Sequence, residues 1–488
     1  MEKINKRWCA GKSTASHLAQ THKQLDDVEV TSAATPRRGS LPCKRRDFLK
    51  NGAGAFAIAA AGTVRGANAP SNRVRLGIVA CARYCRGQRV LGHTLKVPGV
   101  EIAYACDVLE EARNWTAGRL EKETGVRPKK EKDVRKVLED KELDGIICAT
   151  PDHWHATCAV MAMRAGKHVY VEKPCAFCPS EGEIIMATQK ATGKVFQMGN
   201  QRRSSEYVRK AVKLIHEGAI GETKWGKVWY MAGREPIGNG KSVPVPKNFD
   251  WDLWQGPAPR TGYRDNYVPY NWHWFRRWGT GECGNNSIHF VDLARWAMKL
   301  EWPSRVTSSG GEFWIPESDD WQWPDAQMVT WEFPERKFIT WEGLCCTGFK
   351  PYMGYGTGAM IYGTKGTAFF TPGSGVIIDD GHGKNVRKFE PEGADKVKDT
   401  TDRVNGGGIT DPTFYHVSNF VDAVRKNDPA FAYSGAEDAV KSTFLALSAN
   451  VSQLSRSVID VDPSNGGLRT KAGEAFWSRE YEKGWELA

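Results

Sequence analysis

Residues 145–155, GIICATPDHWH, are the stretch of this chain that decides its fold. The first five residues are apolar and predict a buried parallel strand, which the polar and ring-bearing residues Thr150 to His155 follow directly. A second short run, residues 168–171, ends in the same way on Glu172-Lys173-Pro174. Ligands of open α/β sheets bind at the carboxyl ends of the strands, so two neighbouring strand ends bring His155 and Lys173 together. This layout is typical of an enzyme active site.

The residues on both sides of this stretch alternate between strand and helix patterns. Alternation at this spacing predicts a doubly wound parallel sheet with right-handed crossovers. The expected strands are residues 74–80, 101–106, 145–149, 169–171 and 195–198, and the expected helices are residues 87–96, 109–124, 133–138, 157–165 and 180–192.

The composition changes after about residue 201. A helix is expected at 207–216, and then a region rich in Trp, Gly and Pro predicts strands, with helices returning at 413–426 and 436–456. We therefore predict a second, α+β domain with a large, mostly antiparallel open sheet. The predicted divisions are a leader at 1–69, a first domain at 70–200, a second at 201–460, whose last helices pack back on the first, and a tail at 461–488.

The positive charge of the chain is concentrated at its beginning. The formal net charge is +11, and residues 1–69 contribute +7 of it, with 12 Lys/Arg against 5 Asp/Glu. Because the rest of the chain is nearly neutral, a nucleic-acid partner is not expected.

The basic leader contains a twin-arginine pattern, residues 44–50 (KRRDFLK). A Gly/Ala-rich run follows, too short to span a bilayer, and residues 67–69 (ANA) offer a small-x-small cleavage site. These features predict export by the twin-arginine route to the periplasm, with membrane contact only through the export machinery. The alternative is a disordered basic tail.

The 12 cysteines are scattered, apart from Cys175 and Cys178 and the adjacent Cys345 and Cys346. A single CxxC without a second pair or a nearby histidine is a weak metal signal, and a disulfide framework is unusual in a chain of this size. No metal is therefore expected.

The turn after the first strand should cradle a dinucleotide phosphate with a G-x-G-x-x-G pattern. Residues 77–87 read GIVACARYCRG, with Ala80 and Ala82 where glycines are expected after Gly77 and a turn about two residues longer. Each alanine adds a methyl group that crowds the phosphates unless the loop shifts. Arg83 and Arg86 either supply charge to the pyrophosphate or belong to a solvated loop.

Asp107 ends the second strand, where an acidic residue holds a ribose 2′-hydroxyl. A carboxylate at this place repels a 2′-phosphate, so NAD is the expected cofactor and NADP the less favoured one. An Asp before a helix is also a common N-cap, and both roles are compatible.

With these residues assembled, the chain resembles the Gfo/Idh/MocA oxidoreductases, named for glucose–fructose oxidoreductase and inositol dehydrogenase. The resemblance rests on Thr150-Pro151 with His155, on residues 166–169 (GKHV), on Glu172-Lys173-Pro174, and on residues 279–292 (GTGECGNNSIHFVD). It covers roughly residues 72 to 460. It implies a Rossmann domain with an NAD cofactor, followed by a domain that binds substrate and forms oligomers.

The resemblance also implies roles for single residues. Lys173 is expected to hydrogen-bond the substrate hydroxyl and lower its pKa, and His289 to take the hydroxyl proton. The family often has an aspartate four residues before that histidine, where this chain has Asn285, which would face the substrate. Either His289 is a weaker base here, or Asp292 orients it.

The same resemblance assigns the remaining cofactor contacts at the strand ends. Thr150, Pro151 and His155 would line the nicotinamide and its ribose, and Glu172 would steady the strand that carries Lys173.

The chain has 19 tryptophans, several of them just before the 279–292 segment. Aromatic faces stack on sugar rings while neighbouring polar groups bind hydroxyls, so Trp274 and Arg276 are candidate substrate contacts. Packing in a core or an interface is the alternative for any single tryptophan.

These observations predict an exported NAD-dependent oxidoreductase that transfers hydride between a sugar or polyol carbinol and the nicotinamide. The first alternative is an NAD-dependent glycoside hydrolase that uses transient oxidation and elimination. The second is a non-catalytic sugar-binding relative, which the two alanines and Asn285 favour. The resemblance implies a homodimer or homotetramer.

Overall fold

The computed structural model of the chain describes residues 73–487 except 84, 374, 382, 384–385 and 390–410. The predicted leader, with its twin-arginine pattern and cleavage site, lies outside the described residues. No helix in the described residues is long and apolar enough to cross a membrane.

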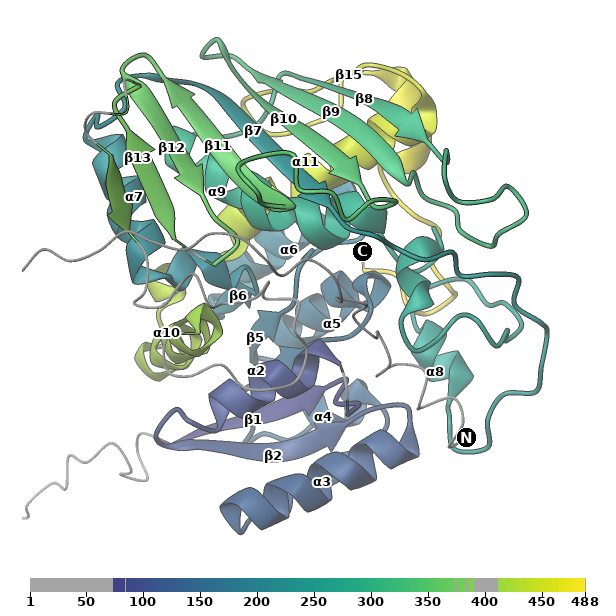
Figure 1. Cartoon of the computed structure of the whole chain (residues 1–488). Helices are drawn as coiled ribbons and strands as arrows, with labels where there is room; N and C mark the ends of the chain where they lie inside the picture. Colours follow the sequence, from purple (N-terminus) through teal and green to yellow (C-terminus); the bar gives the residue numbers. More distant parts are fainter. Residues whose placement is uncertain are drawn as a thin grey trace, which may run out of the picture. The chain divides into compact units, whose positions relative to one another are not determined.

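The first domain is a sheet of six parallel strands in the order β3-β2-β1-β4-β5-β6 (Figure 1). Every residue of β4 and β5 is buried, as expected for central strands of a parallel sheet covered on both faces. The predicted doubly wound sheet is confirmed. Its strands are β1 Val74–Val79, β2 Val100–Cys106, β3 Lys129–Glu131, β4 Gly145–Cys148, β5 His168–Val171 and β6 Phe196–Met198.

Five helices connect these strands: α2 Arg86–Thr94, α3 Glu110–Thr124, α4 Val134–Leu138, α5 Asp152–Arg164 and α6 Pro179–Thr192. α3 and α6 end where Gly125 and Gly193 take the left-handed conformation that glycine adopts at little cost. Helix α5 begins five residues earlier than predicted, because Pro151 stands extended just before it and Asp152 favours the first turn of a helix.

The second domain is built on a nine-stranded sheet in the order β14-β13-β12-β11-β7-β10-β9-β8-β15. Only β7 and β10 pair in parallel among its strands, so the predicted, mostly antiparallel sheet is confirmed. The strands are β7 Thr223–Met231, β8 Arg305–Gly311, β9 Ala326–Phe333, β10 Lys337–Leu344, β11 Thr357–Gly363, β12 Gly366–Phe370, β13 Val376–Asp379, β14 Arg387–Phe389 and β15 Ile459–Asp460.

Helices α9 and α11 contact this sheet, α9 along β7, β10 and β11, and α11 along β8 (Figure 1). The second domain also contains shorter connecting helices and turns. The helices are α7 Glu206–His216, α8 Trp251–Gln255, α9 Ile288–Met298, α10 Pro412–Lys426 and α11 Ala436–Ser455, with 3₁₀ turns η3 Gln201–Ser204, η4 Asn271–Trp274, η7 Pro429–Phe431 and η8 Lys471–Phe476, and a π-helical turn η5 Cys283–Ser287.

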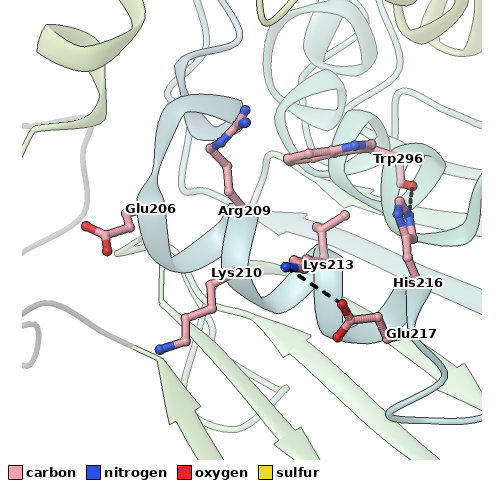
Figure 2. Close-up of a pocket in the computed structure, with 8 residues that line it drawn as sticks. Glu206, Arg209, Lys210, Lys213, His216, Glu217 and Trp296 are labelled. Carbon is pink, nitrogen blue, oxygen red and sulfur yellow. Dashed lines mark hydrogen bonds and ion pairs between the residues drawn. The ribbon is translucent and has the colours of Figure 1, made fainter.

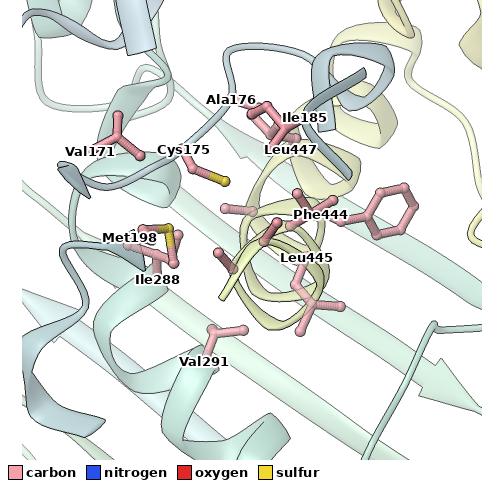
Figure 3. Packing of buried hydrophobic residues seen from close by; sticks show 14 of the residues in the cluster. Val171, Cys175, Ala176, Ile185, Met198, Ile288, Val291, Phe444, Leu445 and Leu447 are labelled. Atoms are coloured by element: carbon pink, nitrogen blue, oxygen red, sulfur yellow. The ribbon is translucent and has the colours of Figure 1, made fainter. Parts of the chain in front are cut away.

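One buried apolar cluster joins the two domains around α11. Figure 3 shows Val171 of β5, Ile185 of α6, Met198 of β6 and Val291 of α9 around α11 side chains such as Leu445. This shared core fixes the end of β5, with Lys173, against the start of α9, with His289.

Two later segments also pack on the first domain. On α10, Val417 and Phe420 are buried with Leu76 and Ile78 of β1. In the tail, Arg479 pairs with Glu181 of α6 at 2.6 Å, and both side chains are buried. The tail, which continues from the second domain, therefore binds α6 of the first domain. Among the described tail residues, η8 is the regular turn.

Candidate active site

The turn after β1 keeps the shape of a phosphate-binding loop despite its alanines. Ala80 has φ +64, a left-handed conformation that favours glycine. Gly87 lies at the start of α2, where a Cβ would come 2.3 Å from the carbonyl oxygen of Ala80, so no larger residue fits without a shift. The first turn of α2 has no acidic side chain, which suits an anion at its N-terminus. These features fit a dinucleotide phosphate.

The two alanines of the loop are expected to respond oppositely to glycine. Ala80→Gly should raise the free energy of unfolding by about 1 kcal/mol, because it relieves a left-handed alanine. Ala82 has no positive φ, so Ala82→Gly should lower that free energy by about 0.5–1 kcal/mol. Urea denaturation of the two variants checks this, and equal changes of the same sign would contradict the loop geometry.

Asp107 closes this loop from the end of β2. Its carboxylate accepts the backbone N–H of Cys81 at 2.7 Å and that of Leu109 at 2.9 Å. Burial raises the pKa of Asp107, while these two backbone donors act against the rise. The N-cap of α3 is Leu109, without a side-chain hydrogen bond, so Asp107 does not cap that helix. Each carboxylate oxygen of Asp107 has further acceptor capacity for the predicted ribose contact.

Arg86 pairs with a carboxylate of the first domain. Its guanidinium lies 3.0 Å from Glu172 at the end of β5, so its charge is compensated within the protein. Arg83 lies over the Trp115 ring of α3, at 5.6 Å from the centroid. The sequence analysis missed the Arg86–Glu172 pair because its members are 86 residues apart.

His155 fixes the segment after β4 against the segment after β5. Its Nε2 lies 2.8 Å from the carbonyl oxygen of Thr150, and its Nδ1 lies 2.6 Å from that of Pro174. The ring therefore joins the two strand ends from within, and 1% of the residue is exposed. Pro151 follows Thr150 directly, so the predicted nicotinamide contacts stand at one strand end.

Asp152, which the sequence analysis left without a role, connects this strand end to the second domain. Its carboxylate accepts the hydroxyl of Thr280 at 2.6 Å and the Thr280 backbone N–H at 3.1 Å. Thr280 belongs to the 279–292 segment, which is thereby held at the end of β4.

Lys173 meets the same segment. Its Nζ donates to the backbone oxygen of Asn285 at 2.6 Å and to the Asn285 Oδ1 at 2.9 Å. Burial lowers the pKa of Lys173, and the charges of Asp152 and Glu172 oppose the shift. Asn285 therefore serves the lysine, holding a partly desolvated ammonium group in place.

His289 is the second residue of α9, directly after the π-helical turn η5, a feature that often marks functional sites. Its Nδ1 is buried and has no hydrogen-bond partner among the described residues. Burial, followed by the charges of Lys173 and Arg202, holds the pKa of His289 well below its usual value. The imidazole is therefore neutral near pH 7, and a neutral imidazole can accept a proton.

The prediction that Asp292 orients His289 is wrong. The Asp292 carboxylate accepts Arg203 Nε at 3.0 Å through both oxygens and the Ser442 hydroxyl at 2.6 Å. Arg203 and Asp292 are both almost fully buried. Asp292 is thus half of a buried ion pair that joins η3 to α9.

Trp274 is also corrected. It is 2% exposed, and it stacks on Trp321 with 3.8 Å between ring centroids, so its ring belongs to a core. Arg276 lies at the surface, where its Nε donates to the carbonyl oxygen of Gln322 at 2.7 Å. The neighbouring Trp251, Trp254 and Trp278 pack on one another. The aromatic cluster therefore supports the 251–278 segment and offers no evident sugar platform.

An ion pair that the sequence pattern does not predict lies near the lysine, with Glu282 buried and Arg234 partly exposed. Arg234, three residues after β7, binds Glu282 through Nε at 3.2 Å. The Glu282 charge acts to raise the pKa of Lys173. In the sequence, Glu282 is connected to the site only by its position three residues before Asn285 in the 279–292 segment.

One described surface pocket lies between α7 and α9 (Figure 2). Its lining includes the Lys213–Glu217 ion pair, and His216 Nε2 lies 3.0 Å from the carbonyl oxygen of Trp296. None of the predicted site residues lines it. No group of three or more His, Cys, Asp or Glu among the described residues is arranged to hold a metal ion.

Residues 74–200 match the Gfo/Idh/MocA family model, described as an oxidoreductase family with an NAD-binding Rossmann fold. This match defines the first domain as an NAD-binding Rossmann domain and confirms NAD as the predicted cofactor.

Two curated relatives are similar to this chain over only part of their length. A glycosyl hydrolase family 109 protein of Saccharopolyspora erythraea is 32% identical over 32% of this chain and 35% of its own length. The levoglucosan dehydrogenase of Pseudarthrobacter phenanthrenivorans is 27% identical over 38% of this chain and 40% of its own length. The chain thus matches well under half of each relative.

Solved structures match over both domains. A levoglucosan dehydrogenase in complex with NADH and levoglucosan has a TM-score of 0.59 at 18% identity, covering 80% of this chain and 99% of that chain. An oxidoreductase domain protein from Kribbella flavida has a TM-score of 0.60 at 19% identity with the same coverage. At these identities the comparison establishes the two-domain fold.

Proposed function

We propose that the whole chain belongs to the Gfo/Idh/MocA oxidoreductases and transfers hydride between a sugar or polyol carbinol and NAD. The observation that carries the proposal is the meeting of Lys173 with Asn285, four residues before a half-buried, neutral His289 whose Nδ1 is buried. A cation and a proton acceptor at the carboxyl ends of a Rossmann sheet are the groups that oxidation of an alcohol needs.

The chain's own residues divide the proton chemistry between them. Lys173, held by Asn285, donates a hydrogen bond to the substrate hydroxyl and stabilises negative charge on its oxygen. His289 takes the hydroxyl proton, and its lowered pKa keeps it free to do so at neutral pH. The phosphate loop, Asp107, Thr150 and Pro151 would hold NAD, which supplies the hydride acceptor when bound.

The pH profile of kcat/KM should show an acid limb from His289 and a basic limb from Lys173. Activity is lost as pH falls through the pKa of His289, and because that pKa is lowered, the acid limb should lie below pH 6.5. Activity is lost as pH rises through the lowered pKa of Lys173, so the basic limb should lie below pH 10.5. Initial rates across the pH range check this. An acid limb above pH 6.5 would contradict a desolvated His289.

The sugar or polyol class of the substrate rests on the relatives. Levoglucosan dehydrogenase, with a sugar-type substrate in its name, is similar in both sequence and fold. The test begins with mass spectrometry of the nucleotide released from the purified protein, followed by a screen of sugars and polyols with NAD. If neither NAD nor NADP binds, the proposal fails.

A second candidate function is supported by the glycosyl hydrolase family 109 relatives. In that reaction the sugar would be oxidised transiently, the aglycone eliminated, water added to the resulting double bond, and the ketone reduced by return of the same hydride. NAD would hold that hydride when bound, so no net NADH would form. Release of nitrophenol from aryl glycosides without added NAD would favour this function. A non-catalytic sugar-binding protein would show neither reaction.

We also propose export by the twin-arginine route to the periplasm, on the residues 44–50 pattern. Cell fractionation of the chain and its Arg45→Lys, Arg46→Lys variant tests this, and equal periplasmic amounts would refute it. A homodimer or homotetramer is proposed from the family resemblance. Sedimentation of a monomer would exclude it.

A further inference from the structure

Asn200 is a buried polar residue that the proposed chemistry does not yet use. It is 1% exposed, and neither Oδ1 nor Nδ2 of its carboxamide has a hydrogen-bond partner among the described residues. Leaving a buried amide unpaired is costly, and native structures rarely do so without a water, ion or ligand to pair with it.

The position of Asn200 places it at the strand ends of the candidate active site. Val171 of β5 pairs with Met198 of β6, and the next residues, Glu172 and Gly199, remain in contact. A Cβ on Gly199 would lie 2.7 Å from a carboxylate oxygen of Glu172. Asn200 therefore follows β6 at the level where Lys173 follows β5.

Other buried polar atoms around this strand end also have no partner in the described part of the chain. They are Glu172 Oε2, Arg86 Nη2, Gln201 Oε1 and His289 Nδ1. Arg86 and Glu172 touch each other, and Glu172 touches the turn that carries Asn200. Unpaired donors and acceptors gathered in one place indicate a polar ligand.

We infer that the carboxamide of Asn200 binds the carboxamide of the nicotinamide ring of NAD. A primary amide offers a donor and an acceptor side by side, so a second primary amide can satisfy both atoms of Asn200 at once. The nicotinamide carboxamide is such a group, and NAD is the ligand that the match of this domain defines. The inference rests on NAD binding and adds a recognition residue to it.

Isothermal titration calorimetry of the full chain tests this without turnover. Three probes are titrated: NAD, 3-acetylpyridine adenine dinucleotide, in which a methyl group replaces the amide nitrogen, and ADP-ribose, which lacks the nicotinamide. The variants are Asn200→Ala and the nearly isosteric Asn200→Asp. Gln189→Ala is the matched control, because this amide of α6 donates to the carbonyl oxygen of Lys194, before β6 begins.

Asn200→Ala is expected to raise the Kd of NAD about tenfold or more, since two hydrogen bonds are lost. It should leave the Kd of ADP-ribose unchanged and abolish the preference for NAD over the acetylpyridine analogue. Asn200→Asp keeps an acceptor for the amide N–H and should retain that preference. Gln189→Ala should leave the Kd values of all three probes unchanged.

Equal weakening of ADP-ribose and NAD would overturn the inference, because it would show a structural role. An unchanged Kd of NAD in both Asn200 variants, with any loss confined to the KM of a sugar, would overturn it as well. If Asn200→Ala does not fold, Asn200→Asp decides: it no longer donates to the nicotinamide carbonyl, so it should raise the Kd of NAD and leave that of ADP-ribose unchanged. An unchanged Kd of NAD in Asn200→Asp would then overturn the inference. Failure of the wild-type chain to bind NAD or ADP-ribose refutes the proposed function itself, and is distinct from these results.

Discussion

Lys173→Met is expected to lower kcat/KM of the proposed carbinol oxidation about 10³-fold. Methionine keeps the length and apolar stem of the side chain but removes the ammonium group that Asn285 holds. Without that cation, nothing at the end of β5 stabilises negative charge on the substrate oxygen. Initial rates with saturating NAD measure the effect.

The control for this variant is cofactor binding. The Kd of ADP-ribose should stay near the wild-type value, because the phosphate loop and Asp107 are unchanged. A variant that keeps more than a tenth of the wild-type kcat/KM would remove Lys173 from the proton chemistry.

Asp292→Asn is expected to lower the free energy of unfolding by about 3 kcal/mol, near the lower end of the range for a broken buried ion pair. The Arg203 side chain is 3% exposed and would lose its buried partner, although Asp438 still pairs with it at 3.1 Å. Because Asp292 does not contact His289, the acid limb of the pH profile should not move. Urea denaturation and the pH profile together test this.

A matched control uses an exposed ion pair. Lys136 and Glu139 lie 2.8 Å apart with both side chains more than half exposed, so Glu139→Gln should leave the unfolding curve unchanged. A shift of the acid limb in Asp292→Asn without loss of stability would restore Asp292 to a catalytic role.

The elements of the first domain could be predicted because their signals are local. The buried strands β4 and β5 are short apolar runs, and the polar residues that end them are visible in the sequence. The boundary of α5 was missed by five residues, since Asp152 to His155 were interpreted as a loop lining the site. β3 is largely exposed and carries only charged residues, so it has no apolar signal.

The pairings inside the site could not be predicted, because they join residues far apart in the chain. Lys173 meets Asn285 across 112 residues, and Arg203 meets Asp292 across 89. Asp292 was assigned to His289 because it lies one turn along the same helix, but its carboxylate accepts hydrogen bonds from Arg203 and Ser442 instead. Trp274 was misassigned for a related reason: composition shows that aromatic rings gather, whereas only packing shows whether a face is free.

We propose that this chain oxidises a carbinol with NAD through Lys173 and His289. The most direct measurement is the absorbance of NADH formed when the NAD-loaded protein is mixed with a panel of sugars, polyols and levoglucosan. We expect NADH formation with at least one compound, and its loss in Lys173→Met and in His289→Ala. NAD binding without NADH formation from any compound, or equal NADH formation in all three proteins, would contradict it.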